Sequence, residues 1–128
     1  MNVTIIGGVN NEYCYKKLDT EFQKEIEKSQ FFLFNILFFR EPLDPTTLGE
    51  EWAARNGAPA IYFAPKERET QSQFIKRLCN STDYMIFLDD RKENNIVKKV
   101  IRIYRNLGKH GKVIMIWIRL GLHQIFTF

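Results

Sequence analysis

Short apolar runs alternate with segments of helical periodicity along most of the chain. The apolar runs are Val3–Ile6, Phe31–Phe39, Ala60–Phe63, Tyr84–Leu88 and Val113–Ile118. Such runs, apolar at nearly every position, are typical of strands that are covered on both faces. Between them, apolar residues recur every three or four positions, as Leu18, Phe22 and Ile26 do, which is the spacing of one helix face. The pattern predicts the order βαβαβαβαβ.

This order predicts an α/β protein with the three-layer Rossmann-like fold, in which helices flank a five-stranded, mostly parallel sheet. Parallel strands joined through helices need right-handed crossovers, which place helices on both faces of the sheet. The expected strand order is 3-2-1-4-5 or the flavodoxin-like 2-1-3-4-5. Residues 1–118 are expected to form one domain, because 128 residues is the usual size of a single domain. The apolar C-terminal tail, residues 119–128, covers either the sheet edge or a partner subunit.

Residues that favour helix ends bracket the second predicted helix. Thr46 or Thr47 suits its N-cap, and Thr47 followed by Glu50 matches the capping-box pattern. Gly57 suits the left-handed residue that commonly follows a helix, as Gly108 does after the fourth predicted helix.

Composition points to an ordered cytoplasmic protein. An apolar fraction of 45% and a charged fraction of 27% are those of globular domains. The longest strongly apolar run, Phe31–Phe39, is far shorter than the roughly 20 residues of a membrane-spanning helix, and no secretory signal pattern opens the chain. Cys14 and Cys79 have no metal-binding spacing, so we expect reduced core thiols.

Charge is distributed unevenly over the chain, whose formal net charge is +4. Residues 1–65 carry six Lys/Arg and nine Asp/Glu, whereas residues 66–128 carry thirteen and six. This excess of positive charge in the second half favours an anionic partner, either nucleotide phosphate or nucleic acid.

A basic stripe follows the fourth predicted helix and consists of Lys98, Lys99, Arg102, Arg105 and Lys109. Two interpretations are open. The stripe is the solvated face opposite the apolar stripe, which is the commoner role of such residues, or it binds a nucleic-acid backbone. No aromatic interleaving of the stripe supports base stacking.

In a sheet of this kind, ligands bind beyond the carboxyl ends of the strands, where the strand order reverses. Four segments follow predicted strands: residues 7–10, 40–47, 64–66 and 89–92. The candidate ligand-binding residues within them are Gly7, Gly8, Val9, Asn10, Arg40, Thr46, Thr47, Asp89 and Asp90.

The pair Gly7-Gly8 lets the backbone approach a ligand and direct amides at an anion near a helix N-terminus. The alternative is a tight strand-to-helix turn. The full G-x-G-x-x-G fingerprint is absent, because Asn10 and Glu12 stand where it requires glycines, so a classical NAD-binding domain is disfavoured.

Carboxylates near the same edge raise two further hypotheses. Glu50 or Glu51 is a candidate general acid/base at the start of the second predicted helix, although a capping role for Glu50 is the commoner use of that spacing. Asp89 and Asp90 suit ribose hydroxyls, or a turn cap. Because no third carboxylate is well placed, we predict no metal site.

Several segments resemble the SLOG superfamily of Rossmann-like proteins. They are Met1–Gly8 (MNVTIIGG), Leu48–Pro59 (LGEEWAARNGAP), Asn80–Leu88 (NSTDYMIFL) and Gly108–Val113 (GKHGKV). The resemblance covers most of residues 1–118, and the most similar branch is that of small YpsA-related proteins, many of them found in phages and conflict-associated loci. It implies a protein that binds nucleotides or nucleotide-derived ligands, frequently as a homodimer. Relatives include lysine-decarboxylase-like phosphoribohydrolases, which split a base from a nucleoside monophosphate, and DNA-processing proteins that bind single strands.

The resemblance also assigns positions. Gly7-Gly8 corresponds to the family's first glycine-containing loop, and Lys76 and Arg77 lie near the place of its basic residues on helix three. The family's second site, a glycine-rich turn that enters helix two, corresponds to Asp44–Gly49. Its Gly-Gly-x-Gly pattern is replaced by Arg40–Thr47, so the tight phosphate cradle is missing. Only Thr47 and Glu50 keep the T-x-x-E part of the phosphoribohydrolase motif.

The leading hypothesis is therefore a protein that binds a nucleotide or nucleotide-derived ligand at the carboxyl ends of its strands, without a further cofactor. A sensor, a sequestering protein and a degenerate enzyme all fit it. The alternatives are a phosphoribohydrolase that cleaves an N-glycosidic bond through Glu50 or Glu51, and a nucleic-acid-binding module that uses the basic stripe.

Overall fold

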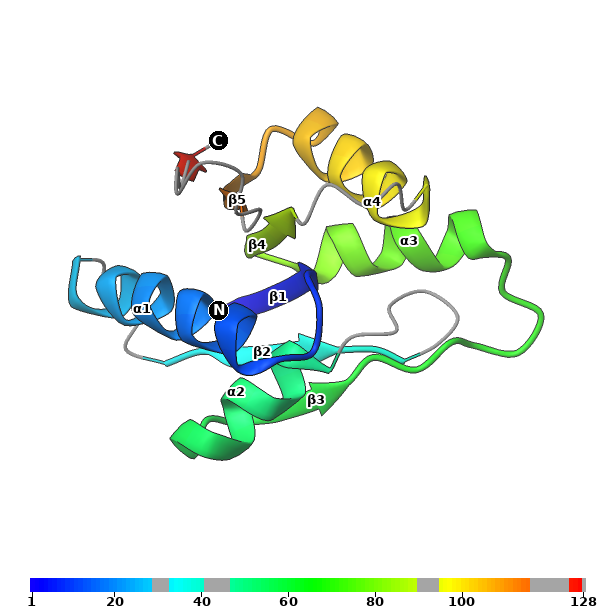
Figure 1. The fold of residues 1–128 in the computed structure, drawn as a ribbon. Coiled ribbons are helices and arrows are strands. Elements are labelled where there is room, and N and C mark those ends of the chain that lie inside the picture. The colour runs from blue at the N-terminus through cyan, green and yellow to red at the C-terminus, as the bar shows by residue number, and fades with distance from the viewer. Residues whose placement is uncertain (29–32, 41–46, 90–94, 116–124, 128) are drawn as a thin grey trace.

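The computed structural model describes residues 1–28, 33–40, 47–89, 95–115 and 125–127 (Figure 1). The described elements, in chain order, are β1 (Asn2–Gly7), α1 (Glu12–Lys28), β2 (Asn35–Phe38), α2 (Leu48–Asn56), β3 (Ala60–Tyr62), α3 (Gln71–Ser81), β4 (Tyr84–Asp89), α4 (Asn95–Asn106), β5 (His110–Met115) and β6 (Ile125–Thr127).

The strand order is β3-β2-β1-β4-β5-β6, which confirms the first of the two expected orders. All pairings from β3 to β5 are parallel, so the five-stranded parallel sheet of the prediction is present. β6 is antiparallel to β5, with Phe126 opposite Val113. Residues 125–127 of the tail therefore lie along the sheet edge, which is one of the two alternatives that the sequence left open.

Each face of the sheet has its own apolar core and its own pair of helices (Figure 1). Residues of α1 and α2 pack on one face, where the Trp52 ring lies 4.0 Å from that of Phe22. Residues of α3 and α4 pack on the other. Alternation along β4 supplies both cores, since Ile86 points to the first and Met85 to the second. The three-layer α/β prediction is confirmed.

Two strands differ from the expected spans by three or more residues at one end, whereas the other three differ by at most one residue at either end. The apolar run Phe31–Phe39 predicts a long second strand, but β2 covers only Asn35–Phe38, and residues 29–32 lie outside the described chain. The fifth strand begins at His110 rather than Val113, because the backbone of β4 pairs with it from Tyr84 onward. Main-chain pairing does not require apolar side chains, so periodicity misses such an end.

The capping box predicted for α2 is wrong. Thr47 is the N-cap residue, but its side chain makes no capping hydrogen bond. A capping box occurs instead at α3, where Thr70 Oγ1 accepts from the Gln73 amide and the Gln73 side chain accepts from the Thr70 amide. At the helix ends, Gly57 and Gly108 have φ values of 64° and 71°, as predicted.

Polar side chains also connect elements inside the fold. Lys112 on β5 is only 5% exposed, and its Nζ lies 2.5 Å from Glu25 Oε1 and 3.6 Å from Glu21 Oε2 on α1. These three residues form a buried charge cluster between the sheet and α1.

Lys109 connects the start of β5 to α3. Its Nζ donates to the carbonyl oxygens of Cys79, Asn80 and Thr82, and so it caps the C-terminal end of α3.

Neither cysteine forms a disulfide, and both are buried, as expected. Burial raises the pKa of the Cys79 thiol to about 11, and its Sγ donates to the Val100 carbonyl.

Among the described residues, no helix combines the length and the apolar character needed to cross a membrane.

Candidate functional site

The strand order reverses between β1 and β4, which neighbour each other at the centre of the sheet. The chain leaves β1 toward α1 on one face and reaches α4 on the opposite face after β4 (Figure 1). This divergence leaves room for a ligand beyond the carboxyl ends of the two strands. Gly7 ends β1 opposite Leu88, and Asp89 ends β4.

Gly7 and Gly8 hold the turn after β1 in a conformation that favours glycine. Their φ values are 87° and 81°. A Cβ atom on Gly7 would lie 2.4 Å from the Leu88 carbonyl oxygen and 3.0 Å from the Phe87 ring, so the two strands meet too closely there for any side chain. The glycine pair is therefore required by the turn, and it leaves the backbone at the end of β1 uncovered by side chains of its own.

A side-chain hydrogen bond links the N-terminal ends of α1 and α2. Asn10 Nδ2 donates to Thr47 Oγ1 over 2.9 Å. The next residue, Asn11, caps α1 by accepting from the Cys14 amide. Because each helix carries partial positive charge at its N-terminus, the two ends together favour an anion. The structure thus brings the first and second predicted segments together at Asn10 and Thr47.

α2 lies close to the sheet because its first turn contains a buried glycine. A Cβ atom on Gly49 would lie 3.3 Å from Ile5 Cβ and 3.6 Å from Ile36 Cγ2. Gly49 thereby sets the distance of the helix N-terminus from β1 and β2. Sequence reasoning placed Gly49 in the second site of the SLOG resemblance but gave it no packing role.

The two candidate catalytic carboxylates have different partners. Glu50 Oε1 accepts from Arg40 at 3.0 Å, and the Arg40 guanidinium lies 5.3 Å from the centre of the Tyr62 ring. Glu51 accepts from Arg55 at 2.7 Å on another side of α2. The pairing of Glu50 with Arg40 links the residue that follows Phe39 to α2, and among the described residues Glu50 and Glu51 have no common partner.

Arg55 joins Glu51 to the start of α1. It also donates to Glu12, and the Arg55 guanidinium lies 4.0 Å from the centre of the Tyr15 ring. This hydrogen bond lowers the pKa of the Glu12 carboxyl. The network adds a second connection between α1 and α2 beside the Asn10–Thr47 bond.

Arg77 connects α3 to the segment after β3. Its guanidinium donates to both carboxylate oxygens of Glu69 and to the Ala64 carbonyl, and it lies 4.2 Å from the centre of the Phe63 ring. These contacts give Arg77 a structural role. Lys76, the other predicted basic residue on α3, is exposed.

The Glu69–Arg77 pair predicts an acid-dependent loss of stability. The hydrogen bond from Arg77 lowers the pKa of Glu69 from 4.5 to about 2. A carboxyl whose pKa is lowered by folding stabilises the protein above its unfolded-state pKa, and this contribution disappears as the pH falls toward the folded-state value. We therefore expect the melting temperature of Glu69→Gln to lie below that of the wild type at pH 7. The gap should close between about pH 4.5 and pH 2, and a gap that persists unchanged at pH 2 would contradict the assignment.

The remaining predicted residues divide between described and undescribed parts of the chain. Val9 is half-buried against the α1–α2 core. Asp89 ends β4 and is partly buried. Thr46 and Asp90 lie outside the described residues. In the described part of the chain, no three His, Cys, Asp or Glu side chains are grouped as a metal ion requires.

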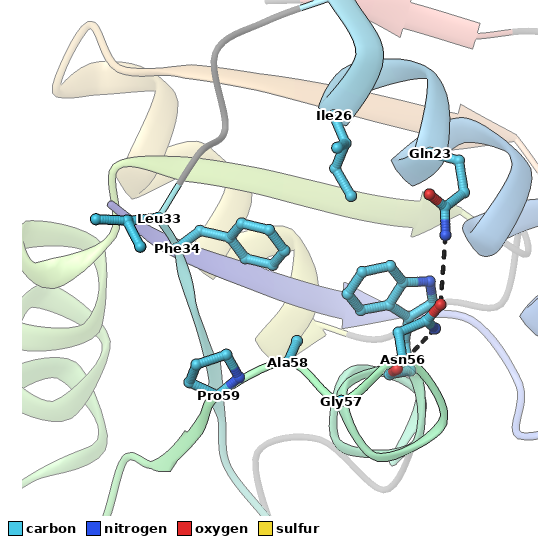
Figure 2. A pocket seen from close by; sticks show the side chains of 9 residues that line it. Gln23, Ile26, Leu33, Phe34, Asn56, Gly57, Ala58 and Pro59 are labelled. Atoms are coloured by element: carbon cyan, nitrogen blue, oxygen red, sulfur yellow. Dashed lines mark hydrogen bonds between the residues drawn. The ribbon is translucent and has the colours of Figure 1, made fainter.

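A pocket of about 400 Å³ lies at the opposite, amino-terminal edge of the strands (Figure 2). It is lined by Gln23, Ile26, Leu33, Phe34, Trp52, Asn56, Gly57, Ala58 and Pro59. Figure 2 shows Gln23 and Asn56 bonded to each other on one side, with Phe34 in the centre and Pro59 opposite. Asn56 Nδ2 also donates to the Tyr15 hydroxyl and the Trp52 carbonyl. These polar groups satisfy one another, which is typical of a seam between packed elements.

Sequence reasoning missed this pocket because its lining contains no charged residue.

The basic stripe on α4 is also partly structural. Lys109 caps α3, and Lys99 Nζ donates to Ser72 Oγ over 2.7 Å.

Comparisons of the chain with protein-family models and with curated proteins found no match.

Proposed function

We propose that the protein binds a nucleotide or nucleotide-derived ligand at the carboxyl ends of β1, β2 and β4. The observation that carries the proposal is the Asn10–Thr47 hydrogen bond, because it holds the N-terminal ends of α1 and α2 within reach of one anion. The turn at Gly7-Gly8 lies directly before it, next to the point where the strand order reverses.

The chemistry of these groups favours phosphate. Helix N-termini and turn amides offer hydrogen-bond donors, which suit oxyanions rather than cations. Asp89, at the end of the neighbouring strand, is suited to accept hydrogen bonds from ribose hydroxyls. Phosphate at one end and hydroxyl groups at the other are features that nucleotides combine.

A charge introduced at Asn10 tests the proposal. Asn10→Asp keeps the size of the side chain but places a carboxylate where the ligand phosphate would lie, so binding should weaken by tenfold or more. The measurement is isothermal titration with mononucleotides, cyclic nucleotides and ADP-ribose derivatives. Asn80→Asp is the matched control, because Asn80 is exposed near the C-terminal end of α3. The proposal fails if the wild type binds no member of the panel, or if both variants bind equally well.

The phosphoribohydrolase alternative requires Glu50 or Glu51 to act on a bound substrate. Glu50 is tested first, because it pairs with Arg40 after β2, whereas Glu51 pairs with Arg55 of its own helix. Release of free base from nucleoside monophosphates, lost in Glu50→Gln but kept in Glu51→Gln, would support catalysis. Ligand binding without any base release would favour a sensor or a sequestering protein.

A further inference from the structure

A second hollow lies along α4. It measures about 480 Å³ and is lined by Phe87, Lys98, Ile101, Arg102, Arg105 and Asn106. Phe87 comes from β4, whereas the other five residues lie on α4. We call this hollow the α4 groove.

Positive charge follows the α4 groove along the helix. Lys98, Arg102 and Arg105 are spaced by four and three residues, so they lie on one side of α4 and span roughly 10 Å along its axis at about 1.5 Å per residue. In the described part of the chain, the side chains of Lys98 and Arg102 form no ion pair and no hydrogen bond, unlike Lys99 and Lys109 of the same stripe. The stripe thus divides into residues that join α3 and residues that border the groove.

An aromatic ring completes the groove. Phe87 is partly buried and lines it beside Ile101, so an apolar surface lies next to the cations. A merely solvated helix face needs neither a hollow nor an aromatic ring. A linear row of cations next to an aromatic ring is the combination that single-stranded nucleic acids require, since their phosphates need the cations and an unstacked base needs the ring. A duplex keeps its bases stacked and would leave Phe87 without a partner.

We propose that the α4 groove binds single-stranded nucleic acid, with Lys98, Arg102 and Arg105 contacting phosphates and Phe87 stacking against a base. This goes beyond the proposed nucleotide site, which uses other residues. The sequence also supports the proposal, because no Asp or Glu follows Glu93 and none would therefore repel a polyanion from this part of the chain.

Fluorescence anisotropy with a labelled 20-nucleotide single strand, measured across salt concentrations, tests the phosphate contacts. The double variant Lys98→Glu/Arg102→Glu should bind at least tenfold more weakly, and the slope of log K against log salt should fall by about 1.4, because each single-strand contact contributes about 0.7. Lys16→Glu is the matched control, since Lys16 is an exposed lysine on α1 across the sheet. Equal affinities and slopes in all three proteins would overturn the proposal.

Phe87→Leu tests the stacking contact while keeping an apolar side chain. It should weaken binding about fivefold or more for the base-bearing strand but not for an abasic strand of equal length. Wild-type protein that binds both strands equally would overturn the proposal, as would binding to vesicles of anionic lipid without binding to the strand.

Discussion

Lys112→Met is expected to lower the free energy of unfolding by about 3–5 kcal/mol, because it removes the cation from the buried charge cluster. The lysine side chain is 6% exposed and lies between Glu21 and Glu25, whose side chains are 8% and 16% exposed. Methionine fills much the same volume, so the loss would come from two carboxylates that lose the buried cation between them, while Glu21 keeps its pair with the exposed Lys24, 3.2 Å away. Urea unfolding at pH 7 measures the effect.

The triple variant Lys112→Met/Glu21→Gln/Glu25→Gln is the control for this prediction. Since it leaves no buried charge in the cluster, it should regain much of the lost stability at pH 7. A loss below 1 kcal/mol in the single variant would show that the cluster is not electrostatically coupled.

Gly7→Ala is expected to lower the free energy of unfolding by about 2–5 kcal/mol. One part is the left-handed backbone, which costs a residue with a Cβ about 1–2 kcal/mol. The other part is the collision with the Leu88 carbonyl oxygen 2.4 Å away, which forces β1 and β4 to shift. The measurement is again chemical unfolding, with melting temperature as a second readout.

Gly108→Ala is the matched control for this prediction. Gly108 has φ = 71°, similar to the 87° of Gly7, but a Cβ atom there would meet nothing within 4 Å. It should therefore incur only the backbone cost. The difference between the two alanine variants measures the close approach of β1 and β4, and equal losses would contradict the collision.

The alternation of apolar and helical segments was sufficient to predict the α/β class but not the strand order. Both expected orders share the same alternation, and they differ in whether β1 or β3 lies next to β4. The structure places β1 between β2 and β4, with Val3 opposite both Ile36 and Tyr84. Such pairings join residues far apart in the chain, which periodicity does not report.

Side-chain roles were harder to predict than elements. The T-x-x-E pattern at Thr47 and the T-x-x-Q pattern at Thr70 look alike in sequence, yet only the second forms a capping box. The difference arises from tertiary partners, because Asn10 engages Thr47 and Arg40 engages Glu50. Long basic side chains pose the same problem, as Lys109 shows by reaching carbonyl groups 27 to 30 residues away.

One outer strand of the sheet, β3, carries a risk of aggregation. It forms the edge opposite β6, and all three of its residues are exposed, including Ile61 at 45% and Tyr62 at 48%. Apolar side chains on an unpaired edge invite other chains to extend the sheet. The brevity of β3 counters this, because three residues provide too few main-chain groups to template a stable foreign strand. The protein therefore limits intermolecular sheet growth by the shortness of this edge rather than by charge on it.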